Sequence, residues 1–233
     1  MMKSKMRRML CAGGSVLTVI ISGCCSMNRL QNVEFRETTA SALAARPPAP
    51  QIFSDDWTGV DFSNPVQAAI GIGTGIAKEV EITKTRAKLD SAMDRVDIPE
   101  TMRSEILKRG AQYLHYSRVE DSDRSDFLFD IIIRRYGIDA KSWSAGVHFR
   151  MDAKVILLDN RKDKELWKSC LNERMPISPD IFGLPASAGN VITMVSLSRL
   201  TADQIADGLH QLAVYTSDKF IHKLQKDFLK KNQ

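Results

Sequence analysis

Three stretches in the second half of the chain alternate between apolar and polar residues, and this pattern constrains the fold most. Only a strand places successive side chains on opposite faces. In the middle stretch, which is the longest, the polar positions carry charged or histidine side chains, so it predicts a strand with one buried face. The three predicted strands are residues 127–134, 147–158 and 165–175.

The polar face of the middle strand turns apolar at Ile156 and Leu158, just before a polar turn at residues 159–163. On a solvated face these two aliphatic side chains would lie exposed next to each other, which monomers tolerate only in small patches. Two explanations stay open. Another part of the chain covers them, or another protein binds there by strand addition or docking. Ile156 and Leu158 are therefore a candidate partner surface.

Helical periodicity marks three other segments. The first spans about 66–95 and begins after Pro65, and the second runs from Ile98 to about residue 116. The last begins with the capping-box pair Thr201 and Gln204 and ends near residue 229. Together the elements predict an α+β fold. It is a two-layer sandwich of a three- to four-stranded, mainly antiparallel sheet packed with helices, plus an N-terminal helix and a tether.

The N-terminus has the organisation of an export signal. A positively charged segment from Lys3 to Arg8 precedes an apolar run over residues 10–21, which is shorter than the about 20 residues of a membrane-spanning helix. The formal net charge of +5 falls to +1 without the four basic residues of this segment. The charge of the whole chain is therefore no argument for nucleic-acid binding.

The apolar run ends in Ile21, Ser22, Gly23 and Cys24, which resembles the lipobox of bacterial lipoproteins. In that family a signal peptidase recognises the three residues before the cysteine and cleaves ahead of it, and the cysteine thiol carries a diacylglyceryl group. The resemblance implies a signal peptide over residues 1–23 and lipidation of Cys24. Two or three acyl chains are enough for stable anchoring in a membrane.

Cys25 and Ser26 follow the lipidated position, where inner-membrane lipoproteins often carry an acidic residue. The resemblance therefore implies the outer membrane, facing the periplasm, with the inner membrane as the alternative because the sorting rule varies. In that oxidising compartment Cys25 and Cys170 are the remaining thiols. The sequence leaves open whether they are free or joined.

The mature chain divides into three predicted regions. Residues 24–64 form the lipid anchor and an extended tether, because residues 40–50 are rich in Ala and Pro. The alternative for this region is a strap packed over the domain, since it also contains large apolar residues. Residues 65–97 form a helical segment, and residues 98–233 form the α/β domain.

The sequence predicts no enzyme, catalytic residue, metal site or cofactor. The four histidines lie far apart, and no nucleophile motif or metal-ligand spacing is present. The glycines at 71, 73 and 75 lack the spacing of a dinucleotide-binding loop. These observations favour a binding protein.

The hairpin VILLDNRKDKELW over residues 155–167, between a helix and a long final helix, resembles small periplasmic α/β domains of outer-membrane assembly lipoproteins. Such domains occur in lipopolysaccharide assembly, the Tol system and curli secretion. The resemblance implies a non-catalytic assembly, transport-accessory or binding component, attached to the membrane by its lipid, with another envelope protein as partner and no nucleic acid. The alternatives are an envelope hydrolase with an unrecognised site and a structural lipoprotein associated with the cell wall.

Overall fold

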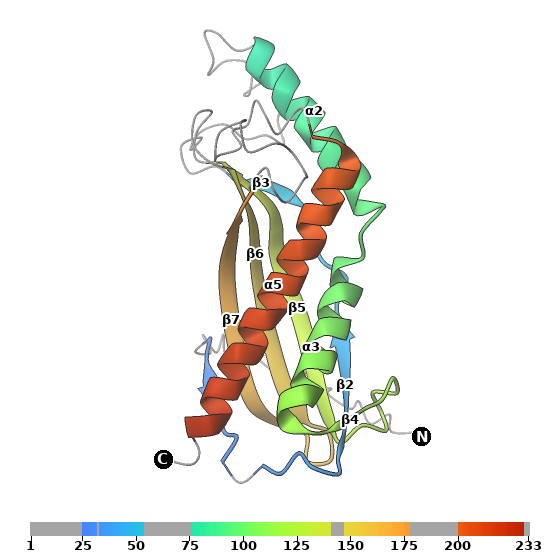
Figure 1. The fold of residues 1–233 in the computed structure, drawn as a ribbon, viewed down its shortest axis with the longest axis vertical. Coiled ribbons are helices and arrows are strands. Elements are labelled where there is room, and N and C mark those ends of the chain that lie inside the picture. The colour runs from blue at the N-terminus through green and yellow to red at the C-terminus, as the bar shows by residue number, and fades with distance from the viewer. Residues whose placement is uncertain (1–24, 32, 54–75, 141–146, 178–199, 231–233) are drawn as a thin grey trace, which may run out of the picture.

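The structure is a computed structural model that describes residues 25–31, 33–53, 76–140, 147–177 and 200–230. Within these residues seven strands form one sheet (Figure 1). The strands are β1 (Met27–Asn28), β2 (Thr39–Ala44), β3 (Gln51–Phe53), β4 (Ser117–Arg118), β5 (Phe127–Ala140), β6 (Val147–Asp159) and β7 (Lys164–Pro176). The helices are α2 (Ile76–Met93), α3 (Ile98–Leu114) and α5 (Ala202–Leu229). Helices α3 and α5 pack on one face of the sheet, and α2 packs against α5 (Figure 1).

Strands β5, β6 and β7 form the antiparallel meander that the alternating sequence predicts. Strand β5 continues to Ala140, beyond the predicted end at residue 134. The prediction stopped too early because a bulge interrupts the alternation of apolar and polar residues at this point. The pairing with β6 shifts between Ile133 and Arg135, so Arg134 and Arg135 are both exposed. A bulge inserts one extra residue and re-aims the side chains that follow.

The sheet is larger than predicted and it is mixed. Its order is β1-β7-β6-β5-β2-β4, with β3 also paired to β5. Strands β2 and β3 run parallel to β5, one after the other along its edge, whereas β1 runs antiparallel to β7. The expectation of three to four mainly antiparallel strands is therefore wrong.

The additional strands come mostly from the predicted tether. Residues 25–53 supply β1, β2 and β3, so an extended tether over residues 24–64 does not describe them. Leu30, Phe35 and Ala42 of this segment are buried. The physical reason is that both edges of the meander offer unpaired backbone groups, and the small side chains of β2 fit under α3. Residues 54–64 lie outside the described part of the chain.

The helices form the second layer of the predicted sandwich. In Figure 1, α5 runs diagonally along the sheet, α3 lies beside it and α2 packs near its N-terminal end. Helix α3 begins where Asp97 accepts a hydrogen bond from the Glu100 backbone N–H at 2.9 Å. The predicted capping box of Thr201 and Gln204 is present at α5. Helix α2 lies within the predicted helix 66–95, whose first residues are outside the described ranges.

The core lies between the sheet and the helices. Phe129, Phe149 and Val155 of the strands and Leu212 and Phe220 of α5 are all buried in one cluster. Where α5 crosses β6, the closest approach is at a glycine. A Cβ atom on Gly208 would lie 2.2 Å from Cε2 of the Phe149 ring, so only glycine fits there without movement.

We expect Gly208→Ala to destabilise the protein by about 1–3 kcal/mol, the range for overpacked cores. Alanine is the better helix former by about 1 kcal/mol. A loss of stability could therefore not come from helix propensity and would be due to the steric contact with Phe149. The measurement is urea unfolding. Gln211→Ala, an exposed position on the same helix, is the matched control and should shift stability by less than about 0.5 kcal/mol. A Gly208→Ala protein as stable as the wild type would contradict the contact.

Asp126 holds the start of β2 against the start of β5. Its Oδ2 accepts hydrogen bonds from the Thr39 backbone N–H at 2.8 Å and from the Thr39 hydroxyl at 3.1 Å. Arg161 forms an ion pair with the same carboxylate. The backbone hydrogen bond from Thr39 contributes most to lowering the pKa of Asp126, and the hydroxyl and Arg161 add to it against the opposing effect of burial.

Asp126→Asn should therefore lower stability at neutral pH, by an amount that shrinks in acid. A carboxyl group whose pKa is lowered in the folded state stabilises the fold above its unfolded pKa, near 4, and loses that contribution as pH falls through the folded pKa. Denaturant unfolding of both proteins between neutral pH and about pH 3 measures the difference. A difference that stays constant over this range would show that the charge of Asp126 does not act in this way.

Candidate functional site

The candidate site is the face of the sheet opposite the helices, which we call the outer face. No helix in the described ranges packs on it (Figure 1). Cross-strand register assigns its residues. They are Met27 of β1, Ser41 and Leu43 of β2, Gln51 and Phe53 of β3, Leu128, Asp130, Ile132, Arg134, Arg135, Gly137 and Asp139 of β5, His148, Arg150, Asp152, Lys154, Ile156 and Leu158 of β6, and Glu165, Lys168, Cys170, Asn172, Arg174 and Pro176 of β7.

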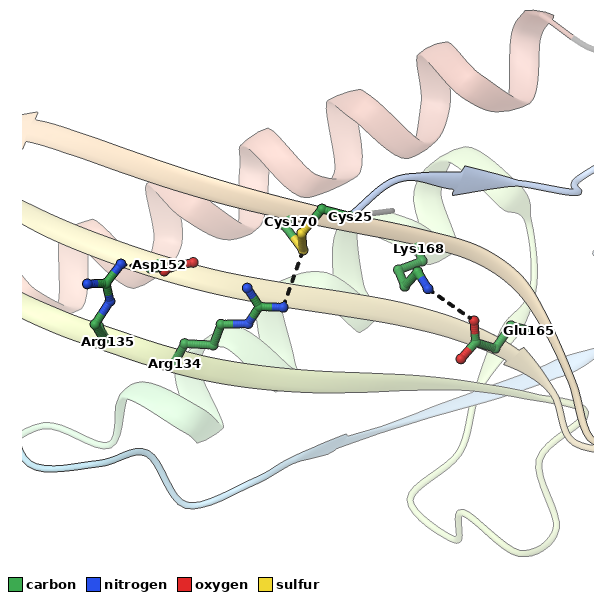
Figure 2. The surroundings of a disulfide bond; sticks show 7 residues. All are labelled: Cys25, Arg134, Arg135, Asp152, Glu165, Lys168 and Cys170. Atoms are coloured by element: carbon green, nitrogen blue, oxygen red, sulfur yellow. Dashed lines mark hydrogen bonds and ion pairs between the residues drawn. A yellow bond between two sulfur atoms is a disulfide. The ribbon is translucent and has the colours of Figure 1, made fainter. Parts of the chain in front are cut away.

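A disulfide between Cys25 and Cys170 lies on this face (Figure 2). The two Cα atoms are 5.5 Å apart, within the usual range for disulfides. The bridge continues the register of β1 on β7, in which Met27 pairs with Lys168. Two residues back along β1 and two forward along β7 lead to Cys25 opposite Cys170. The two thiols that the sequence left unassigned are therefore bonded to each other.

The segment after Cys25 is attached to the domain at several further points. The Arg29 backbone N–H donates to the Leu166 carbonyl at 2.7 Å, which extends the pairing with β7. The side chain of Asn28 donates to the backbone carbonyl of Asp227 near the end of α5, at 2.9 Å. The Asp227 carboxylate in turn accepts a hydrogen bond from the buried Trp167 indole at 3.1 Å. Cys25 is thus held at the sheet and not at the end of a free chain.

Basic side chains surround the disulfide. Figure 2 shows Arg134 reaching from β5 across β6 toward it, and the guanidinium Nη2 lies 3.6 Å from the Cys170 sulfur. Arg135 pairs with Asp152 at 3.0 Å, and Lys168 pairs with Glu165 at 3.5 Å (Figure 2). Both arginines reach the outer face because of the bulge in β5. Alternation places Arg134 on the mixed face of the predicted strand, but that strand ends at residue 134, so Arg135 was missed.

Aliphatic side chains occupy the end of the outer face near the β6–β7 turn. Asp130 lies in register between Leu43 and Ile156. Burial raises the pKa of the Asp130 carboxyl, and the positive charge of Lys154 partly opposes this rise. At the opposite end, Arg174 pairs with the buried Asp139 at 2.9 Å.

The predicted partner residues lie at the aliphatic end. Ile156 is only 7% exposed and Leu158 is half-buried, so the two offer little apolar surface by themselves. Leu43 is 49% exposed and lies one strand beyond Asp130. Leu43 could not be chosen from the sequence pattern, because β2 falls in the predicted tether. Binding of a partner at Ile156 and Leu158 stays a prediction.

The predicted lipidation site lies outside the described residues. Ile21, Ser22, Gly23 and Cys24 precede the first described residue, Cys25. The assignment of the signal peptide and of the lipidated cysteine therefore stays a prediction.

Perturbed titrating groups elsewhere have structural causes. The Arg103 guanidinium donates to Glu100 at 2.6 Å and lowers the pKa of that carboxyl. Burial raises the pKa of Tyr116, whose hydroxyl donates to the Leu107 carbonyl at 3.0 Å. Within the described ranges no group of three or more His, Cys, Asp or Glu side chains could hold a metal ion. None of the described helices is long and apolar enough to cross a membrane.

No protein-family model matches the chain, and no curated protein matches its sequence. Solved structures give distant likenesses. Protein XCC0632 from Xanthomonas campestris, of the DUF330 family, is 12% identical with a TM-score of 0.35, over 55% of this chain and 64% of that protein, a little under two thirds of its length. The PelC dodecamer from Paraburkholderia phytofirmans is 6% identical with a TM-score of 0.32, over 78% of this chain and 89% of PelC.

A third likeness is to lipoprotein GNA1162 from Neisseria meningitidis. It is 20% identical with a TM-score of 0.23, over 65% of this chain and 94% of that protein. The solved structures that this chain resembles therefore include a lipoprotein. Likenesses at these TM-scores do not assign a function to this chain.

Removing the disulfide should cost stability. The bridge joins residues 145 positions apart, and cross-links typically contribute about 2–5 kcal/mol, with more for longer loops. We expect the Cys25→Ala/Cys170→Ala variant to unfold at lower urea concentration than the oxidised wild type. Reductant should lower the wild-type midpoint to a similar value and leave the variant unchanged. A wild type that is insensitive to reductant would show that the bond is absent or does not stabilise the fold.

Proposed function

We propose that the protein is a lipid-anchored, non-catalytic component of the bacterial envelope that acts in assembly, in transport or as a binding partner. The observation that carries the proposal is the disulfide of Cys25, because Cys25 directly follows the predicted lipidated residue, Cys24. The proposal places the protein at the outer membrane, facing the periplasm, with the inner membrane as the alternative.

Two independent features support export to the envelope. The N-terminal sequence has the charge, apolar length and small residues of a lipoprotein signal. Disulfides persist in oxidising compartments such as the periplasm and are rare in the cytosol. The Cys25–Cys170 bond therefore agrees with the export signal. The two features are independent, because the signal was identified from the N-terminal sequence alone.

The chemistry of the outer face supports a binding role. Its charged side chains form pairs across strands, such as Arg135 with Asp152, and the neighbouring positions are aliphatic. Such a surface suits contact with another surface. A hydrolase would instead need a nucleophile, a base and a group that stabilises the developing charge. We propose two partners, the membrane and another envelope protein, and none that is a nucleic acid.

Cys24→Ser should abolish labelling with radioactive palmitate and leave the precursor uncleaved, because both steps depend on the Cys24 thiol. Cys25→Ser is the matched control and should be labelled and processed like the wild type. Labelling that persists in Cys24→Ser and disappears in Cys25→Ser would move the anchor by one residue. Labelling that is absent from the wild type would overturn the lipoprotein proposal.

A further inference from the structure

The disulfide fixes where the lipid would leave the domain. The Cα atoms of Cys25 and Cys170 are 5.5 Å apart, and Cys24 is the residue directly before Cys25 in the sequence. Cys170 lies midway along β7, on the outer face. A lipid on Cys24 must insert into the bilayer from that position. The membrane surface is then brought to the outer face, with no intervening linker to separate them.

The side chains near this point suit a membrane surface. In the described ranges Arg134 makes no ion pair, and its guanidinium lies at the disulfide. Lys154 is directly opposite Cys170 in the sheet, and Lys168 is two residues away along β7. Arg134 is exposed, and Lys154 and Lys168 are partly exposed. Basic residues close to a membrane are attracted to anionic lipid headgroups. Their long apolar stems can lie along the neighbouring aliphatic residues, of which Ile132, opposite Lys154, and Ile156, opposite Lys168, are the nearest in register.

We propose that the outer face around the disulfide lies on the bilayer surface and binds anionic phospholipid headgroups, with Arg134 and Lys154 contacting the phosphates. This inference rests on the proposed lipidation of Cys24. It adds an orientation and a ligand class to the anchor. The sheet faces the membrane, and the layer of α2, α3 and α5 faces away from it into the aqueous compartment.

Arginine footprinting of the full-length mature protein tests this orientation. The lipidated protein is placed in vesicles of phosphatidylcholine and phosphatidylglycerol and, separately, in detergent, and both are treated with a water-soluble dicarbonyl reagent. Arg135 on the outer face has a side chain that is 49% exposed, and its matched controls on the helix side, Arg86 and Arg95, are each 46% exposed. All three take part in an ion pair, so they differ mainly in the face they occupy.

In vesicles we expect the labelling of Arg135 to slow by roughly fivefold or more relative to detergent. This is the change in equilibrium that corresponds to the attraction of one basic side chain to an anionic membrane surface. Arg86 and Arg95 should be labelled at the same rate in both. If all three arginines are labelled as fast in vesicles that carry the protein as in detergent, the proposed orientation is wrong, although the lipid anchor is still supported. A wild type that does not float with the vesicles would overturn the anchor and the orientation together.

Charge reversal tests the ligand class. Arg134→Glu/Lys154→Glu should stay with the vesicles through its lipid but lose the protection of Arg135. The matched control, Lys219→Glu/Lys226→Glu, changes the net charge by the same amount at exposed positions of α5. In this control Arg135 should stay protected. Protection that survives the outer-face reversal would overturn headgroup binding. Protection found in cell envelopes but not in lipid vesicles would overturn it in favour of a protein partner.

Discussion

The pairing of β1 with β7 determines how the segment that begins at Cys25 joins the domain. Only two residues of β1 form the ladder, yet its register places Cys25 opposite Cys170, where a disulfide closes it. Asn28 then connects the same segment to the C-terminal part of α5. These contacts begin at Cys25, the first described residue. The segment of residues 25–29 therefore belongs to the domain and is not a spacer in front of it.

The two faces of the sheet differ because of one irregularity as well as the alternation. Alternation alone gives an inner face that packs on α5 and an outer face of mixed polarity. The bulge after Ile133 adds an extra outward side chain, so that Arg134 and Arg135 stand together on the outer face. The same bulge restores Tyr136 to the buried side, where it is fully covered. One inserted residue thus concentrates positive charge beside the disulfide without disturbing the core.

Local patterns predicted the elements whose signal is contained in their own residues. The meander, α3 and the capping box of α5 follow from alternation, helical period and end signals. The strands β1, β2 and β3 could not be predicted in this way, because they are short and β2 consists mostly of small residues. They gain strand structure only by pairing with β5 and β7. The disulfide was missed for the same reason, since the register of β1 depends on long-range pairing. Leu43 became a candidate only once β2 was in place, and Arg135 only once the bulge in β5 was known.

Peptide mapping of the mature protein without reduction shows whether Cys25 and Cys170 are joined next to a lipidated Cys24. Trypsin should release residues 24–29 and residues 169–174, which contain Cys25 and Cys170. We expect mass spectrometry to find these two peptides as one disulfide-linked species that also carries the acyl groups of Cys24. Recovery of the N-terminal lipopeptide with Cys25 as a free thiol, or joined to a different cysteine, would contradict the account.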